Sequence, residues 1–181
     1  ESIVMMTAAL LIGLICGVFA VGLNWSVHSL RHFIKEFELG WGIIFIPALG
    51  AGFAVYLVRS IIKDSAVHGV SDVIKAMALG SEILRRRMIH SRFIGSLLTV
   101  GTGGSTGLEG PIVSIGGAVG SALGRWMEMN ERHKKLFVGY GAAGAVAGIF
   151  NAPLTGLIFS LEIIIGEWTY LTILPTIIAA V

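Results

Sequence analysis

The segment Gly101-Thr-Gly-Gly-Ser-Thr-Gly-Leu-Glu-Gly-Pro111 says more about the class of this protein than any other part of the chain. Its one charged residue is Glu109, and no further charge lies between Arg92 and Arg125. An ionisable side chain inside so long an apolar stretch is costly in a lipid bilayer, which makes it a functional residue by default. Glu109 is therefore the first candidate for a functional role.

The composition around this segment is that of an integral membrane protein. Of the 181 residues, 55% are hydrophobic and 13% are charged, whereas a soluble domain carries about a quarter charged residues. The uncharged stretches Ile3–Leu23 and Gly40–Val58 each approach the roughly 20 residues that a helix needs to cross hydrocarbon. We therefore expect a single all-α, polytopic membrane domain over residues 1–181. The net charge of +2 is too small to indicate nucleic-acid binding.

The positive charges indicate the topology. They form three clusters, at Arg59–Lys63, at Arg85–Arg92 and at Arg125–Lys135, and the positive-inside rule puts all three on the cytoplasmic face. Two segments between these clusters, Val70–Leu79 and Phe93–Gly124, must then enter the membrane and return, or stay shallow. The longer one accommodates two helices joined by a hinge at the glycine-rich run. Non-helical backbone at membrane depth is tolerated only where it is buried in protein or lines a cavity. We therefore expect the glycine-rich hinge to line a transport pathway.

The remaining elements continue as helices separated by short breaks. We expect a helix from Lys135 to Phe150, a break at Asn151-Ala-Pro153, a helix over Leu154–Ile165 and a last helix from Tyr170. The polar residues from His28 to Glu38 are predicted to form an external loop between the first two spans. Small residues four positions apart let helices approach closely, and they occur at Gly116, Gly120, Gly124, Gly144 and Gly148.

Two helix starts at membrane depth predict an anion site. One follows His68-Gly69-Val70-Ser71-Asp72, with Ser71 or Asp72 as the N-cap candidate, and the other follows Gly107-Leu108-Glu109-Gly110-Pro111. Free backbone N–H groups and the positive end of the helix dipole both attract an anion. An ionised Glu109 carboxylate competes for that place and a protonated one vacates it, so Glu109 is predicted to be a gate and a candidate proton carrier. The predicted anion-binding residues are His68, Gly69, Val70, Gly107, Leu108 and Gly110.

These motifs resemble the CLC chloride channels and proton-coupled anion transporters along essentially the whole chain. Gly107–Pro111 is similar to the family's Gly-Arg-Glu-Gly-Pro motif, with Glu109 at the gating glutamate, and Gly141–Glu162 looks like the next two family helices. The resemblance implies a homodimer in the bilayer, with one anion pathway per subunit and two inverted repeats in each subunit. It implies that this chain is the first repeat and that the second repeat, which completes the pore, lies outside it.

Three departures from the family pattern affect the predicted function. His68 replaces the serine that contacts the central anion in the family, and its ring N–H can still hold a halide. Leu108 replaces the usual arginine and removes a positive charge near the anion. Ile163 replaces the internal glutamate of proton-coupled members, which favours passive or weakly coupled transport over strict antiport. Glu162 and Glu167 are the candidate substitutes on a proton path.

Each candidate residue also has a structural interpretation that the sequence leaves open. Glu109 fits a neutral buried carboxyl or a helix cap, and His68 fits a loop residue without a ligand. Glu162 fits a cap or ion-pair partner at its helix end, an interpretation that we favour over a proton role.

Two other functional classes fit the sequence less well. Gly103–Gly107 has the Gly-x-Ser-x-Gly spacing of a hydrolase nucleophile at Ser105, but that motif belongs at a strand-to-helix turn, and no His–Asp pair is indicated. A purely structural membrane subunit is the other alternative. We therefore predict a non-enzymatic, multi-pass protein of the cell (plasma) membrane that carries small monovalent anions, above all chloride, and needs no metal or cofactor.

Overall fold

Helices account for every element in the computed structural model, which describes residues 2–36, 44–64, 69–79 and 84–181. The prediction of an all-α fold is confirmed. In chain order the elements are α1 (Ser2–Glu36), α2 (Ile46–Tyr56) with its π-helical extension η2 (Leu57–Ile62), α3 (Val70–Leu79), α4 (Arg87–Gly101), α5 (Glu109–Trp126), α6 (Glu131–Phe150), α7 (Pro153–Phe159) with its π-helical extension η4 (Ser160–Ile165), and α8 (Tyr170–Ala180).

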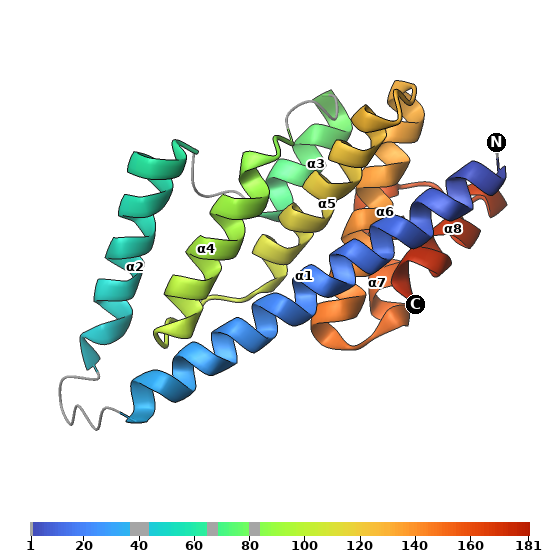
Figure 1. Cartoon of the computed structure of the whole chain (residues 1–181). Coiled ribbons are helices and arrows are strands. Elements are labelled where there is room, and N and C mark those ends of the chain that lie inside the picture. The colour runs from blue at the N-terminus through green and yellow to red at the C-terminus, as the bar shows by residue number, and fades with distance from the viewer. Residues whose placement is uncertain (1, 37–43, 65–68, 80–83) are drawn as a thin grey trace.

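Helices α5 and α6 form the centre of the bundle (Figure 1). Residues 112–121 of α5 and 137–147 of α6 are buried without interruption, which is the pattern of helices surrounded by others on all sides. Helix α6 packs against α1, α5, α7 and α8, whereas α5 also contacts α3 and α4. The central pair therefore fixes where the short helix α3 and the start of α5 lie.

Glycines lie at the contact between the two central helices, and their lack of side chains lets the two backbones touch. A Cβ atom on Gly116 would overlap with the Gly141 carbonyl oxygen, and a Cβ atom on Gly141 would overlap with the Gly116 carbonyl oxygen. One turn further along α5, a Cβ atom on Gly120 would overlap with the Phe137 carbonyl oxygen. About one turn beyond Gly141 on α6, Gly144 lies against Gly13 of α1. The prediction of close packing at these glycines is confirmed.

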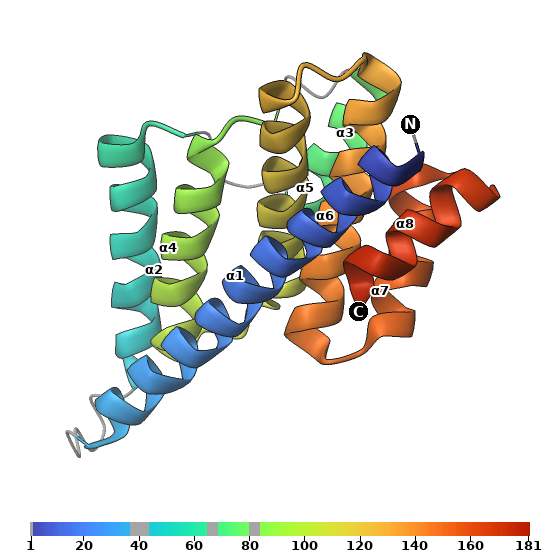
Figure 2. The same cartoon turned by 45° about the vertical axis from the view of Figure 1, so that its right-hand side comes forward.

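Helix α1 is longer than the sequence predicts and crosses the bundle obliquely in both views (Figures 1 and 2). Its 35 residues span about 52 Å, well beyond the thickness of hydrocarbon. The prediction of a loop from His28 onward is wrong as far as Glu36, and residues 37 and 38 lie outside the described ranges. Neither glycine nor proline interrupts this part of the helix, and His32 and Glu36 pair across one turn, Nδ1 to Oε1 at 3.3 Å.

The second predicted span differs in its bounds. Helix α2 begins at Ile46, with Pro47 in its first turn, and η2 continues it past Val58 to Ile62. Residues 40–43 of the predicted span lie outside the described ranges. Among the described helices, only the stretch Ile3–Glu36 is both long and apolar enough to cross a membrane by itself. The shorter apolar helices are Ile46–Ile62, Pro153–Ile165 and Tyr170–Ala180.

Large apolar side chains cover much of the outer surface. Trp25 on α1, Leu49 on α2 and Leu154 on α7 are each more than two thirds exposed. So many exposed large apolar side chains are unusual for a water-soluble monomer and indicate contact with a membrane or with another protein surface. The outside of this helical bundle is therefore suited to lipid or to a further apolar partner surface.

The three basic clusters gather at one end of the bundle, as the topology prediction requires. Both views show the end of α2 with η2, the start of α4, the end of α5 and the start of α6 at the same end (Figures 1 and 2). Arg125 fastens this end, because its Nη2 donates to the Leu84 carbonyl oxygen at 3.1 Å and its Nη1 donates to Ser121 Oγ at 2.6 Å. The segment that contains α4 and α5 thus enters the bundle and returns.

Helix α6 begins earlier than predicted, because Asn130 caps it. The Asn130 side-chain oxygen accepts a hydrogen bond from the His133 N–H at 2.9 Å, so the charged residues from Glu131 to Lys135 belong to the first turns of the helix. The predicted break follows at the other end of α6. Asn151 adopts a left-handed conformation with φ of 52°, and Pro153 opens α7.

Replacing Asn130 by alanine should lower the free energy of unfolding by about 1 kcal/mol, because the His133 N–H loses its partner. Replacing it by aspartate, which keeps an acceptor oxygen at this position, should leave stability within about 0.5 kcal/mol of wild type. Denaturant unfolding of the purified protein in detergent, followed by circular dichroism, checks both values. Equal stability of the alanine and aspartate variants would contradict the capping role of Asn130.

Candidate functional site

The glycine-rich hinge lies between α4 and α5 and reverses the chain. Helix α4 ends at Gly101, and the Gly103 and Gly104 N–H groups close it by donating to the carbonyls of Val100 and Thr99 at 3.0 and 2.9 Å. Gly103 has a φ of 102°, which L-residues with a side chain rarely adopt. The hinge then leads directly to Glu109, the first residue of α5. The prediction of two helices joined by this hinge is confirmed.

The amino ends of α3 and α5 meet at Gly69 and Gly110. A Cβ atom on Gly69 would lie 3.2 Å from the Gly110 Cα, and Gly69 has a φ of 47°. The buried Ser114 hydroxyl lies between them, with Oγ 2.9 Å from the Gly69 carbonyl oxygen and 3.0 Å from that of Gly110. Two helix termini with free N–H groups and positive dipole ends thus converge on one place.

Glu109 occupies the first position of α5, where the sequence analysis puts it. Its N-cap residue, Leu108, makes no side-chain cap, and the Glu109 residue itself is exposed. The carboxylate folds back over Gly107, since a Cβ atom there would overlap with Glu109 Oε2. The Glu109 side chain is thus open to whatever lies against this end of α5, and its gating role stays a prediction. A negatively charged side chain at a helix amino end interacts favourably with the helix dipole, so it competes there with any external anion.

The other predicted anion-site residues divide into three groups. Gly69, which directly precedes Val70 at the start of α3, contacts Gly110, and Gly107 shares a pocket lining with Gly69. Leu108 is half-buried and packs on the hydrophobic core. His68 lies outside the described residues, so its role stays a prediction.

The N-cap prediction for α3 is wrong. Helix α3 begins at Val70, so Ser71 and Asp72 both stand inside its first turn rather than before it. The Asp72 side chain is turned toward α4, where its Oδ2 lies 2.9 Å from Arg92 Nη2. The glycine that precedes the helix has no side chain to offer as a cap.

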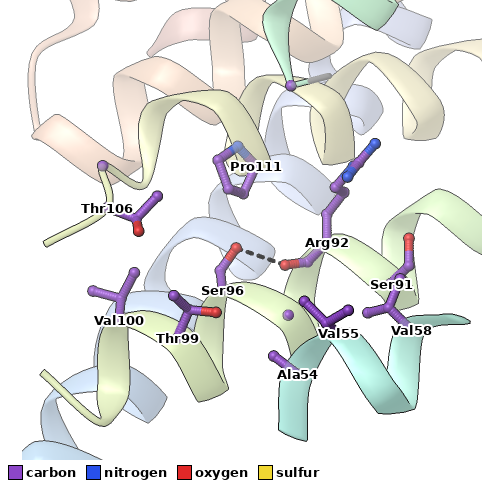
Figure 3. A pocket seen from close by; sticks show the side chains of 13 residues that line it. Ala54, Val55, Val58, Ser91, Arg92, Ser96, Thr99, Val100, Thr106 and Pro111 are labelled. Atoms are coloured by element: carbon purple, nitrogen blue, oxygen red, sulfur yellow. Dashed lines mark hydrogen bonds between the residues drawn. The ribbon is translucent and has the colours of Figure 1, made fainter. Parts of the chain in front are cut away.

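A pocket of about 360 Å³ opens beside the meeting point of the two helices (Figure 3). Its walls come from α2 with η2, from α4 and from the chain around the start of α5. The polar groups in the lining belong to Ser91, Arg92, Ser96, Thr99 and Thr106, and Gly69 and Gly107 bring the predicted anion site into the same wall. The pocket therefore places a charged and hydroxyl-bearing surface of α4 beside the two helix starts.

The two candidate proton-path residues lie on another part of the chain. Glu162 is exposed on η4, and Glu167 is exposed in the loop between η4 and α8. Glu167 Oε2 lies 3.8 Å from Arg132 Nη2 at the start of α6. Glu162 was a candidate ion-pair partner at its helix end, but Arg132 pairs with Glu167 instead. Exposed pairs of this kind contribute at most about 1 kcal/mol.

Two residues at the site escape the sequence analysis. Ser114 looks like one more small residue in an apolar helix, and only the three-dimensional fold shows that it bridges Gly69 and Gly110. Arg92 is counted with the topology signals, although its side chain is only 10% exposed and lines the pocket. The sequence feature that could have identified Arg92 is its position: it lies more than one turn inside helix α4, whereas Arg85 and Arg86 precede the helix.

Comparison with known proteins identifies the family. The family described as "Voltage gated chloride channel" matches residues 50–181. The chain belongs to this family, the CLC chloride channels and transporters. It is 33% identical over 145 residues to a ClcB-like chloride channel protein from Ralstonia nicotianae, covering 78% of this chain and 34% of the relative. It is 30% identical over 185 residues to the H⁺/Cl⁻ exchange transporter ClcA of Vibrio cholerae, covering 96% of this chain and 40% of the relative.

Solved CLC structures share the fold. The chain matches a CLC-type fluoride/proton antiporter with a TM-score of 0.78 and 26% identity, over 98% of this chain and 44% of that one. It matches a eukaryotic CLC transporter with a TM-score of 0.81 and 18% identity, over 97% of this chain and 36% of that one. The chain thus spans well under half the length of these CLC proteins.

Family membership decides the question of enzymatic function. CLC proteins are membrane-embedded channels or transporters and not enzymes. In agreement, Ser105 lies exposed in a connection between two helices, whereas a hydrolase nucleophile elbow requires a strand-to-helix turn. The hydrolase alternative is therefore wrong.

Proposed function

We propose that the protein containing this chain carries small monovalent anions, chloride above all, across a membrane. The observation that carries the proposal is the convergence of the α3 and α5 amino ends at Gly69 and Gly110, bridged by Ser114. Backbone N–H groups at such ends bind anions without a fixed counter-charge, so an anion can also leave. In this proposal the N–H groups of Gly69, Val70, Gly107, Leu108 and Gly110 contribute one half of the anion path.

Glu109 is the proposed gate of this path. Its carboxylate stands at the first position of α5 and leans over Gly107, so it occupies the region where a passing anion would meet the helix dipole. An ionised carboxylate excludes an anion from this place by charge repulsion, and a neutral or displaced one admits it. Anion passage is then governed by the position and charge of one side chain.

We propose passive or weakly proton-coupled transport, with strict chloride/proton antiport as the second candidate. Ile163 supports passive or weakly coupled transport, because an apolar side chain at this position cannot relay a proton. Glu162 and Glu167, the candidate substitutes, are both exposed. The second candidate is favoured by relatives that are named H⁺/Cl⁻ exchange transporters. The two candidates differ in whether a chloride gradient drives protons uphill.

The proposal extends to the assembly. We propose that residues 1–181 form the first of two inverted repeats, that a second repeat completes the pore, and that two subunits form a homodimer in the cell (plasma) membrane. The share of the solved CLC chains that this chain covers, 36–44%, supports the half-fold. The exposed apolar side chains of α1, α2 and α7 offer surfaces for lipid and for the remaining protein.

Flux measurements on the full-length protein in liposomes test the proposed function. An outward chloride gradient should drive chloride efflux far above that of protein-free liposomes, with little sustained uphill proton movement. A Ser105→Ala variant should transport chloride at the wild-type rate, because Ser105 has no chemical role in the proposal. Strong uphill proton transport would favour the antiporter candidate, and the absence of chloride efflux would contradict anion transport altogether.

A further inference from the structure

An ion pair between α3 and α4 lies next to the two helix amino ends. Arg92 Nη2 lies 2.9 Å from Asp72 Oδ2, and the two side chains are only 10% and 18% exposed. Asp72 stands in the first turn of α3, where its N–H donates to the Gly69 carbonyl oxygen at 3.2 Å. Arg92 lines the pocket together with Gly69 and Gly107, and Figure 3 shows its side chain leaving α4 among the other lining residues.

Asp72 occupies a position from which it opposes anion binding. A carboxylate is favoured in the first turn of a helix because it interacts with the same positive dipole end that attracts an external anion. Left uncompensated, the Asp72 charge would cancel the attraction of the α3 amino end. Leu108, at the start of α5, brings no positive charge to offset it. A cation paired with Asp72 makes the electrostatic potential at the meeting point more favourable to an anion.

Arg92 is this cation, and one of its N–H groups is not used by the pair with Asp72. Its Nε is buried and has no hydrogen-bond partner among the described residues. A buried donor without a partner is costly, so this N–H is available to a further acceptor. A guanidinium group carries five N–H donors, so Arg92 can neutralise Asp72 with one edge and still present positive charge to the wall that it shares with Gly69 and Gly107.

We propose that Arg92 is a positioning residue for anion transport, which neutralises Asp72 and so keeps the amino end of α3 available to the anion. This inference rests on the proposed anion transport and adds a specific electrostatic requirement to it. The two charges have opposite effects on the anion, although they form one ion pair. Arg92 favours chloride at the meeting point of α3 and α5, and Asp72 disfavours it.

Opposite charge effects give opposite shifts in chloride affinity. In the full-length protein in liposomes, Arg92→Met should raise the half-saturating chloride concentration roughly tenfold, because it removes the positive charge that lies against the Asp72 carboxylate. Asp72→Asn should lower that concentration several-fold, on the order of fivefold, because it leaves Arg92 unneutralised. The double variant, which removes both charges, should return close to the wild-type value. Calorimetric titration of the detergent-purified variants with chloride should give the same order of affinities.

A structural role for the ion pair predicts a different pattern. Each single variant would then lose stability and transport in the same direction, without opposite shifts in chloride affinity, and that result would overturn the inference. Arg31→Met is the matched control, because Arg31 Nε also donates to α4, to the Val100 carbonyl oxygen at 3.0 Å, but Arg31 does not line the pocket that Arg92 lines. It should reduce stability and leave chloride affinity unchanged.

The outcomes separate this inference from the proposed function. If Arg92→Met fails to fold, the Asp72→Asn variant still decides, since tighter chloride binding supports the inference and unchanged or weaker binding overturns it. A wild-type protein that binds and transports chloride while both single variants shift affinity in the same direction would refute only the role of Arg92. A wild-type protein that neither transports nor binds chloride would refute the proposed function and this inference with it.

Discussion

Glutamine in place of Glu109 is expected to raise passive chloride flux at neutral pH roughly tenfold, which is the size of one charge-assisted interaction at a helix amino end. Glu109 begins α5 and leans over Gly107, so its charge lies where a passing anion would meet the N–H groups. The amide has nearly the same shape and no charge. It should therefore stop repelling the anion. Chloride efflux from proteoliposomes at neutral pH measures this effect.

The chain offers a close control for the Glu109 variant. Glu131 is likewise an acidic residue at the first position of its helix, α6, and its Oε1 pairs with Lys134 Nζ at 2.9 Å. Glu131→Gln should cost a few tenths of a kcal/mol in stability, as expected for a charge at an exposed helix end, and should leave flux unchanged. Wild-type chloride flux in the Glu109→Gln protein would contradict the gating role.

Replacement of Gly141 by alanine is expected to lower the free energy of unfolding by about 3 kcal/mol, as overpacking of a rigid interface does. The added Cβ atom would overlap with the carbonyl oxygen of Gly116 in α5, which is backbone and cannot rotate away. The two central helices would have to separate along their whole contact. The loss of thermal stability in detergent, followed by size-exclusion chromatography, measures this effect.

The predicted loss of stability distinguishes Gly141 from an ordinary helical glycine. In an exposed helix, alanine normally stabilises relative to glycine by about 0.5–1 kcal/mol. Gly52 of α2 is the control, because it is exposed and no described atom lies within 4 Å of a Cβ atom built there. Gly52→Ala should leave stability unchanged or raise it slightly. A Gly141→Ala protein as stable as the Gly52→Ala protein would mean that α5 and α6 do not touch through their glycines.

The helices were largely predictable where local signals mark their ends. Pro153 and the left-handed Asn151 define the break before α7, and Pro111 falls in the first turn of α5. Where no such signal exists the predictions were wrong. A change from apolar to polar residues after Leu23 suggests a loop, yet α1 continues to Glu36 because nothing in its backbone interrupts it. A change in polarity along the sequence shows what surrounds a helix, and it does not show where the helix ends.

The amino-acid sequence alone was enough to establish the membrane class, the helix–hinge–helix segment and the place of Glu109 at a helix amino end. These features follow from composition, from the cost of a charge in lipid and from short-range backbone preferences. The contact of Gly69 with Gly110, the bridge through Ser114 and the pairing of Asp72 with Arg92 became visible only in the folded chain. Such contacts join residues 20 to 45 positions apart, and they form because the α5–α6 packing fixes the neighbouring helices, which no local pattern encodes.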